Sequence, residues 1–412
     1  MEIANKLINL LPQFDEIKEI LKSNPEGEFI LKKTFETFNG IQKQKPSTSD
    51  SDDGVEECYF LVQALLDKFW EVIHTGHFSE VPLDVRKTYG LASFCKIIFL
   101  LLESMEKSQI EKCNEVLDDA ILLGCTQNIF SNEAKFMNLL TELFDSELDP
   151  TVDLQLPIIE TLPRRSVDCD ILRLDCPSLE EFNEKCFTPQ VPALLLNTIR
   201  HWPALEKWRD LNYILKLAGN RTVPIEIGSN YATDEWSQQL MKIKDFLKRQ
   251  FSQPKQHQSP NDDKHEIEYL AQHELFEQIP LLKNDFSIPD YCLLGEHKEM
   301  VDIKAWLGPK GTISPMHYDP KHNILCQIFG SKKIILASPK DSDNLYPHEG
   351  EFLSNTSQIY AASPDLEKYP RLSMVKFYHL TLQTGDCLYM PPKWWHYVES
   401  ESPSFSVSFW WE

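Results

Sequence analysis

The sequence predicts an α+β protein in which an N-terminal helical domain, residues 1–150, precedes a domain of short β-strands. Three observations support this prediction. Apolar residues recur at spacings of three and four before Pro150, short β-branched and aromatic runs follow it, and 412 residues are too many for one ordinary core. The composition, 42% hydrophobic and 25% charged, is that of a folded globular chain.

The N-terminal part contains a series of amphipathic segments. In the first, apolar residues from Ile3 to Leu21 follow the period of one helix face, and Pro12 marks a break or a new first turn. Further runs of this type are Glu57–His74, Arg86–Ser104, Gln109–Leu123 and Glu133–Leu148. The polar segment Lys43–Asp53 lacks apolar anchors and is expected to be a loop.

After Pro150 the pattern changes to short runs that Pro, Gly and Asp interrupt. These runs include Val191–Leu196, Thr222–Gly228, Ile324–Phe329, Lys333–Ala337, Cys387–Met390 and Phe405–Trp411. Many short strands separated by turn residues are typical of a β-sandwich or barrel. The polar segment Gln253–Asp263 is expected to be a loop within this half.

Charge and cysteine content restrict the partners and the compartment. A net charge of −22 repels phosphate backbones, so we expect no direct DNA binding and an affinity for basic segments of protein substrates, although solubility alone is the simpler interpretation. The ten cysteines include no Cys-x-x-Cys pair, which argues against a zinc ribbon or a disulfide framework. Several cysteines stand within apolar segments, where a reduced thiol behaves as a small apolar residue, so we expect a nuclear or cytoplasmic protein. No apolar run is long enough for a membrane helix, so we expect no membrane anchor.

The candidate chemistry lies in the segment Gly311–Pro320. His317 and Asp319 form a His-x-Asp pair, and side chains two apart on a strand project to the same face. His396 lies where an antiparallel strand could return beside them. Two histidines and one carboxylate form a facial triad that leaves coordination positions open, as in Fe(II) oxygenases. Taken alone, a His-x-Asp pair more often makes a surface hydrogen bond.

A longer pattern makes the pair specific. Lys332 begins a strand after it, a Gly385-Asp386 turn leads into an apolar strand that ends at Pro391, and His396 follows. With this pattern, residues from about 165 to 412 resemble the JmjC-domain oxygenases, and most closely the arginyl-hydroxylase subfamily, also called lysine demethylase 8 or JmjC-domain protein 5. The matching stretches are Tyr269–Pro280, Ile288–Cys292, Ala305–Pro315 and Ser404–Trp411.

The resemblance implies a fold and a set of cofactors. The fold is a double-stranded β-helix, a cupin-like jelly roll, as the catalytic domain over residues 165–412, which leaves an interaction role for residues 1–150. The implied ligands are Fe(II) at His317, Asp319 and His396, 2-oxoglutarate as co-substrate, and O₂.

Four residues are candidates for binding 2-oxoglutarate. Lys332 stands beside an apolar run, where an ammonium group is costly to bury unless it meets an anion. The alternative is a lysine that extends to solvent from a strand end. Tyr269, Ser314 and Asn323 fall on positions that resemble the family's other contacts, and could equally be a core tyrosine, a turn serine and a strand cap.

The resemblance also suggests a substrate, an arginine side chain in a protein, with Glu226 and Trp236 as the binding residues. A carboxylate can bind guanidinium with two hydrogen bonds and an indole can stack on it. A strand-edge glutamate and a packing tryptophan are equally consistent with the sequence.

Three other functions stay open. A methyl-lysine demethylase would share the iron chemistry, and a peptidase acting on histone tails would use the metal to activate water, either of which would make the protein a chromatin regulator. A non-enzymatic scaffold would use the helical half instead. The intact triad and Lys332 argue against the scaffold.

Overall fold

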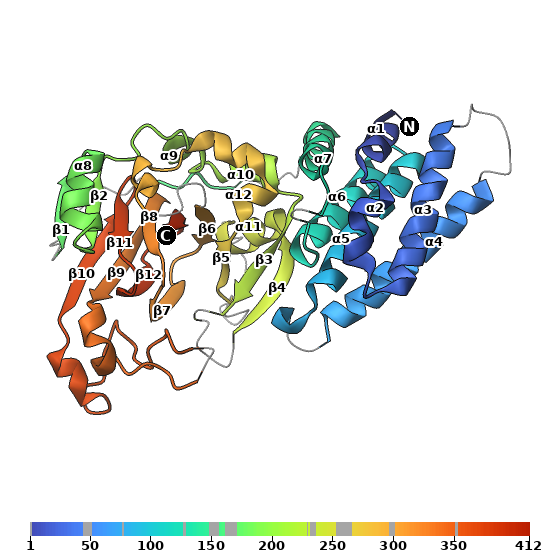
Figure 1. Cartoon of the computed structure of the whole chain (residues 1–412). Helices are drawn as coiled ribbons and strands as arrows, with labels where there is room; N and C mark the ends of the chain where they lie inside the picture. Colours follow the sequence, from blue (N-terminus) through green and yellow to red (C-terminus); the bar gives the residue numbers. More distant parts are fainter. Residues whose placement is uncertain are drawn as a thin grey trace, which may run out of the picture. The chain divides into compact units, whose positions relative to one another are not determined.

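The structure is a computed structural model that describes residues 2–43, 52–75, 78–126, 129–147, 156–160, 171–228, 230, 236–252, 266–295, 301–350 and 353–412. Most of the expected loop Lys43–Asp53 and all of Gln253–Asp263 lie outside these residues. The chain forms two compact units, which are described separately (Figure 1). Unit 1 comprises Met1–Pro150 with Asn220–Thr222, and unit 2 comprises Thr151–Gly219 with Val223–Glu412.

Unit 1 is helical, as predicted. Its helices are α1 Glu2–Leu10, α2 Phe14–Leu21, α3 Pro25–Lys43, α4 Asp52–Ile73, α5 Leu83–Glu103, α6 Lys107–Leu122 and α7 Glu133–Glu147. Helix α5 packs against α1, α2, α3, α4 and α6, and its residues from Thr88 to Leu101 are buried on nearly every face. A helix that is apolar on all sides is stable only in such a central position. No helix among the described residues is long and apolar enough to cross a membrane.

Helix α3 is absent from the amphipathic runs identified in the sequence. It buries Ile30, Leu31, Thr34, Phe35 and Phe38, which follow helical spacing, so the signal was present. The neighbouring Phe29 is 65% exposed, and this apolar residue outside the buried face obscures the pattern.

Unit 2 contains two β-sheets among its described residues. The larger has the strand order β1-β2-β11-β8-β13-β6-β5-β3-β4 and the smaller has the order β10-β9-β12-β7. The strands are β1 Leu172–Asp175, β2 Ala193–Leu196, β3 Thr222–Ile227, β4 Ser237–Lys242, β5 Glu268–His273, β6 Asp302–Gly308, β7 Ile313–Tyr318, β8 His322–Phe329, β9 Ser331–Ala337, β10 Phe377–Gln383, β11 Cys387–Met390, β12 Trp395–Ser400 and β13 Ser404–Trp411. The prediction of a helical part followed by a β-sandwich is confirmed.

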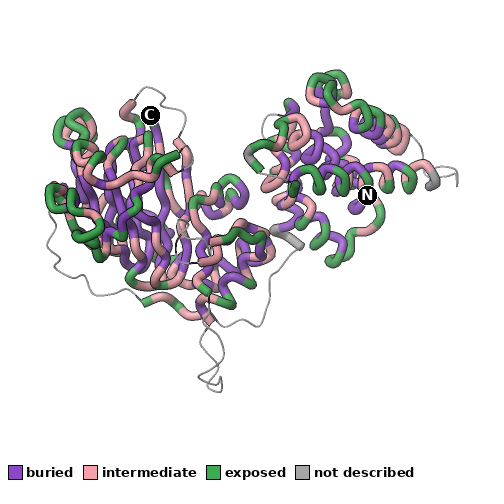
Figure 2. The backbone as a smooth tube through the Cα atoms, turned by 90° about the horizontal axis from the view of Figure 1, so that it is seen from below, coloured by how far each residue is buried: buried purple, intermediate pink, exposed green. Residues whose placement is uncertain are grey.

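The larger sheet is covered on both faces. One core joins its strands β2, β8 and β11 to β9, β10 and β12 of the smaller sheet, through residues such as Leu325, Ile334 and Leu388. The other core contains Trp208, Phe246 of α11 (Ile243–Phe251) and Phe276 of α12 (Leu275–Gln278). Long runs of buried residues pass through the part of the chain that carries the C-terminus (Figure 2). The space between the two sheets holds the candidate site.

Candidate metal centre and co-substrate cavity

The two predicted histidine ligands are cross-strand neighbours. Strands β7 and β12 pair antiparallel, with His317 directly opposite His396. Asp319 follows the last residue of β7, two positions after His317. One possible ligand atom from each of the three side chains lies within 4.8 Å of the others, which is close enough for all three to hold one ion.

Backbone carbonyls fix the orientation of both imidazoles. His317 Nδ1 lies 2.7 Å from the carbonyl oxygen of Pro315, and His396 Nδ1 lies 3.0 Å from that of Trp394. A carbonyl oxygen can only accept, so each Nδ1 carries a proton and donates it. The lone pair of each ring is then on Nε2, the nitrogen that would bind a metal, which is the usual arrangement of a metal-binding histidine.

The charge state of the cluster also suits a cation. Burial lowers the pKa of His396 to about 4, the adjacent His317 acts in the same direction, and the Asp319 carboxylate opposes them. His396 is therefore neutral near pH 7, as a metal ligand must be. Asp319 Oδ2 is buried and accepts no hydrogen bond from the described residues, and it lies 3.6 Å from His396 Nε2. A bound cation would satisfy this oxygen.

The cluster opens into a cavity of about 240 Å³. The cavity wall includes eight of the nine residues singled out in the sequence, namely Glu226, Tyr269, Ser314, His317, Asp319, Asn323, Lys332 and His396. Trp236 is not among the lining residues and lies directly before β4. The structure therefore gathers eight of these nine residues in one cavity wall, and the Trp236 side chain lies close enough to Glu226 to lower the pKa of that carboxyl.

Lys332 is the most unusual residue of the cavity. It is 1% exposed, and its Nζ donates to Tyr269 Oη at 3.0 Å. None of the described carboxylates forms an ion pair with it, and burial lowers the pKa of its amine to about 7. A buried amine without a counter-charge is costly unless an anion binds beside it. The residues present therefore fit a small carboxylate ligand.

Polar groups elsewhere in the cavity also lack partners. Asn323 is 5% exposed and its Oδ1 accepts no hydrogen bond within the described residues. In the antiparallel register of β3 and β5, Glu226 lies directly opposite Tyr269. Burial raises the pKa of the Glu226 carboxyl, and the Trp236 side chain partly offsets this effect. A cationic substrate group beside Glu226 would favour its charged form.

Several lining residues were not identified from the sequence as part of the site. Trp306 donates from Nε1 to Ser408 Oγ at 2.8 Å, and Trp410 has a buried Nε1 without a partner in the described structure. Side chains alternate between the two faces of a strand, and this pattern in β6 and β13 could have placed both indoles on the face that lines the cavity. Asn355 and Thr356 come from the connection between β9 and β10, where no periodic pattern points to a site.

Comparisons with known proteins agree with this geometry. A cupin-like domain family matches residues 179–412. The chain is 57% identical over 412 residues to the Jumonji C domain-containing protein 5 of Drosophila melanogaster, covering 99% of this chain and 98% of that protein. It is 34% identical over 409 residues to lysine-specific demethylase 8 of Xenopus tropicalis, covering 87% and 89%, and 36% identical over 372 residues to lysine-specific demethylase JMJ30 of Arabidopsis thaliana, covering 85% of each. This chain therefore belongs to the cupin-like JmjC-domain family of oxygenase-type enzymes.

Proposed function

We propose that the chain is an Fe(II)- and 2-oxoglutarate-dependent oxygenase that hydroxylates arginine side chains in basic segments of partner proteins. The observation that carries this proposal is the content of one cavity. It combines the His317, Asp319 and His396 cluster, a buried lysine without an acidic partner, and the carboxylate of Glu226. These groups match a metal, an anionic co-substrate and a cationic substrate.

His317, Asp319 and His396 would hold Fe(II), leaving the other coordination positions open. When bound, iron with 2-oxoglutarate and O₂ supplies the oxidation of a C–H bond, with succinate and CO₂ as co-products. The chain itself binds and orients the metal, the co-substrate and the substrate, and it excludes water from them.

The co-substrate residues would act on the far carboxylate of 2-oxoglutarate. Lys332 Nζ supplies the charge, and Tyr269 Oη, 3.0 Å away, supplies a second donor. Ser314 and Asn323 line the same cavity and offer further hydrogen-bonding groups. Filling the cavity with this anion would remove the cost of the unpaired amine.

Glu226 would bind the guanidinium group of the substrate. A carboxylate accepts two parallel hydrogen bonds from arginine, which a lysine ammonium cannot supply. The net charge of −22 would also attract basic protein segments. Trp236 remains a proposed stacking partner, although it does not line the cavity.

Methyl-lysine demethylation is the second candidate. The relatives from Xenopus tropicalis and Arabidopsis thaliana carry names of lysine-specific demethylases. Hydroxylation of an N-methyl carbon would require the same metal and co-substrate residues. The two candidates therefore differ only in the group that the Glu226 side of the cavity accepts.

The test is incubation of the full chain with Fe(II), 2-oxoglutarate and basic peptides, followed by mass spectrometry. We expect one oxygen to be gained on arginine, and replacement of that arginine by lysine to abolish the gain. Glu226→Gln should reduce arginine turnover far more than it changes 2-oxoglutarate decay without peptide, because positioning the target and activating the metal are separate tasks. Faster loss of a methyl group from lysine would reject hydroxylation and favour the second candidate.

A further inference from the structure

Strand β7, which carries His317, is the last strand of the smaller sheet, yet its outer edge is covered. The connection between β9 and β10 returns along this edge. Thr356 forms an antiparallel bridge with His317, and Ser357 N donates to Met316 O at 2.8 Å. Pro347 bridges Ser357 on the far side. The segment Asn355–Ser357 therefore acts as an additional short strand beside the metal ligands.

Asn355 holds the residue between the two ligands at both of its backbone polar groups. Tyr318 N donates to Asn355 O at 3.0 Å, and Asn355 Nδ2 donates to Tyr318 O at 3.0 Å. Tyr318 is the middle residue of the His-x-Asp pair. A rotation of either peptide of Tyr318 would move His317 or Asp319, and each of the two bonds restrains one of these peptides.

Two further restraints on this turn come from β12, which carries the third ligand, and from the turn that precedes it. Lys393 N donates to Asp319 O at 2.7 Å, and the Tyr318 ring packs edge-on against Trp395 with centroids 4.9 Å apart. Trp395 directly precedes His396. Asn355 supplies the restraint on the opposite side, and its side chain also lines the cavity.

We propose that Asn355 is a positioning residue for the metal centre, which it orders by fixing both peptides of Tyr318 from the edge of β7. This inference rests on the proposed metal site. Asparagine suits the task because its short side chain lets one residue offer a backbone acceptor and an amide donor to the same neighbour. Groups that orient metal ligands without touching the metal typically change metal affinity by about 10–100-fold when they are removed.

The experiment measures Mn²⁺ binding by calorimetry for the full-length wild type, Asn355→Ala and Asn355→Asp. Both variants lose the donor to Tyr318 O, and aspartate does so at nearly constant side-chain volume. We expect Asn355→Ala to bind Mn²⁺ about tenfold more weakly. The Co²⁺ absorption spectrum of both variants should shift, because it reports the geometry of the ligands and not the stability of the fold.

Gln358→Ala is the matched control. Gln358 Nε2 donates to Pro347 O at 3.0 Å, an amide-to-carbonyl bond in the same connection that does not touch β7. Its Mn²⁺ affinity and Co²⁺ spectrum should equal those of the wild type. Unchanged binding and spectra in both Asn355 variants, or an equal loss in Gln358→Ala, would overturn the inference. Absence of Mn²⁺ binding by the wild type would instead reject the proposed metal site.

Discussion

At the scale of single residues, Lys332 is where stability and the proposed function oppose each other most clearly. Its amine is buried, and its pKa falls from 10.5 to about 7 for that reason. Between these values the unfolded chain binds more protons than the folded chain, so the contribution of Lys332 to stability rises with pH. Relative to Lys332→Met, the wild type should gain about 3 kcal/mol of unfolding free energy between about pH 7 and about pH 10.

Urea denaturation of the two proteins at both pH values tests this expectation, and groups other than Lys332 cancel in the comparison. Saturating 2-oxoglutarate with Mn²⁺ should remove most of the pH dependence, because the ligand carboxylate would favour the charged amine. A constant difference between wild type and Lys332→Met would mean that the amine is not desolvated.

The same residue gives a binding prediction. Lys332→Met should weaken 2-oxoglutarate binding by about 2–5 kcal/mol, because one partner of a buried charge pair is lost. Calorimetric titration in the presence of Mn²⁺ measures this change. Lys332→Arg should recover part of the affinity. An unchanged Kd in Lys332→Met would place the anion elsewhere in the cavity.

The cluster of His317, Asp319 and His396 was predictable from the sequence because strand geometry is regular. An antiparallel return brings His396 opposite His317, and Asp319 follows directly after the last residue of β7. The Asn355 contact was not predictable, since it depends on where a long connection meets the sheet edge. Trp236 shows a second limit, because a residue type suited to arginine does not determine whether its side chain lines the cavity or only contacts a residue that does.

At the scale of elements, the turn between β8 and β9 determines where the strand that carries Lys332 begins. Gly330 has φ +76°, and a Cβ atom there would overlap the carbonyl oxygen of Pro403. Gly330→Ala therefore combines a left-handed backbone with a steric overlap, and should cost about 2–5 kcal/mol of unfolding free energy. Thermal and urea unfolding of the purified variant measure the loss.

Gly385 allows the cost of a left-handed backbone to be measured without a steric overlap. It has φ +85° in the turn before β11, but a Cβ atom there would meet nothing within 4 Å. Gly385→Ala should therefore cost about 1–2 kcal/mol, the backbone contribution alone. Equal losses in the two variants would show that the Pro403 overlap relaxes without cost.

Elements were predictable where their apolar pattern is local. Runs such as Ile324–Phe329 and Cys387–Met390 became β8 and β11, because each is short and bounded by turn residues. The connection between β9 and β10 was not anticipated as a structural element. It contains two short 3₁₀ helices, Pro339–Asn344 and Pro370–Met374, and isolated bridges, of which Thr356 with His317 depends on a contact with β7 and not on a repeated pattern.

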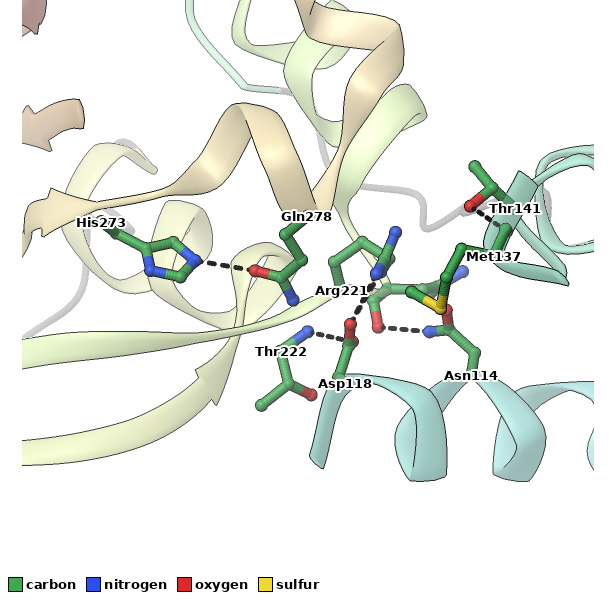
Figure 3. Close-up of polar contacts among 9 residues, drawn as sticks. Asn114, Asp118, Met137, Thr141, Arg221, Thr222, His273 and Gln278 are labelled. Atoms are coloured by element: carbon green, nitrogen blue, oxygen red, sulfur yellow. Dashed lines mark hydrogen bonds and ion pairs between the residues drawn. The ribbon is translucent and has the colours of Figure 1, made fainter. Parts of the chain in front are cut away.

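At the scale of the whole chain, neither unit is one continuous segment of the sequence. Asn220–Thr222 belongs to unit 1, although it lies far along the chain from the helices. Asp118 of α6 accepts from Arg221 Nη2 and from Thr222 N, both at 2.7 Å, and Asn114 Nδ2 donates to Asn220 O at 3.1 Å (Figure 3). No periodic signal in the sequence could have identified a contact between residues about 100 positions apart.

This contact gives the last prediction. Asp118 is fully buried and Arg221 is 7% exposed, so Asp118→Ala removes the counter-charge of a buried guanidinium group and the carboxylate that accepts from Thr222 N. The loss should be about 3–5 kcal/mol of unfolding free energy.

The adjacent Asp119 is the matched control, because burial, with the charge of Asp118, raises its pKa to about 6. Its carboxylate therefore opposes folding above that pH, and Asp119→Asn should be neutral or stabilising at pH 7 and without effect near pH 4. Urea denaturation of the full-length proteins at both pH values separates the two carboxylates, and a loss of similar size in both variants at pH 7 would contradict the role of the Asp118–Arg221 pair.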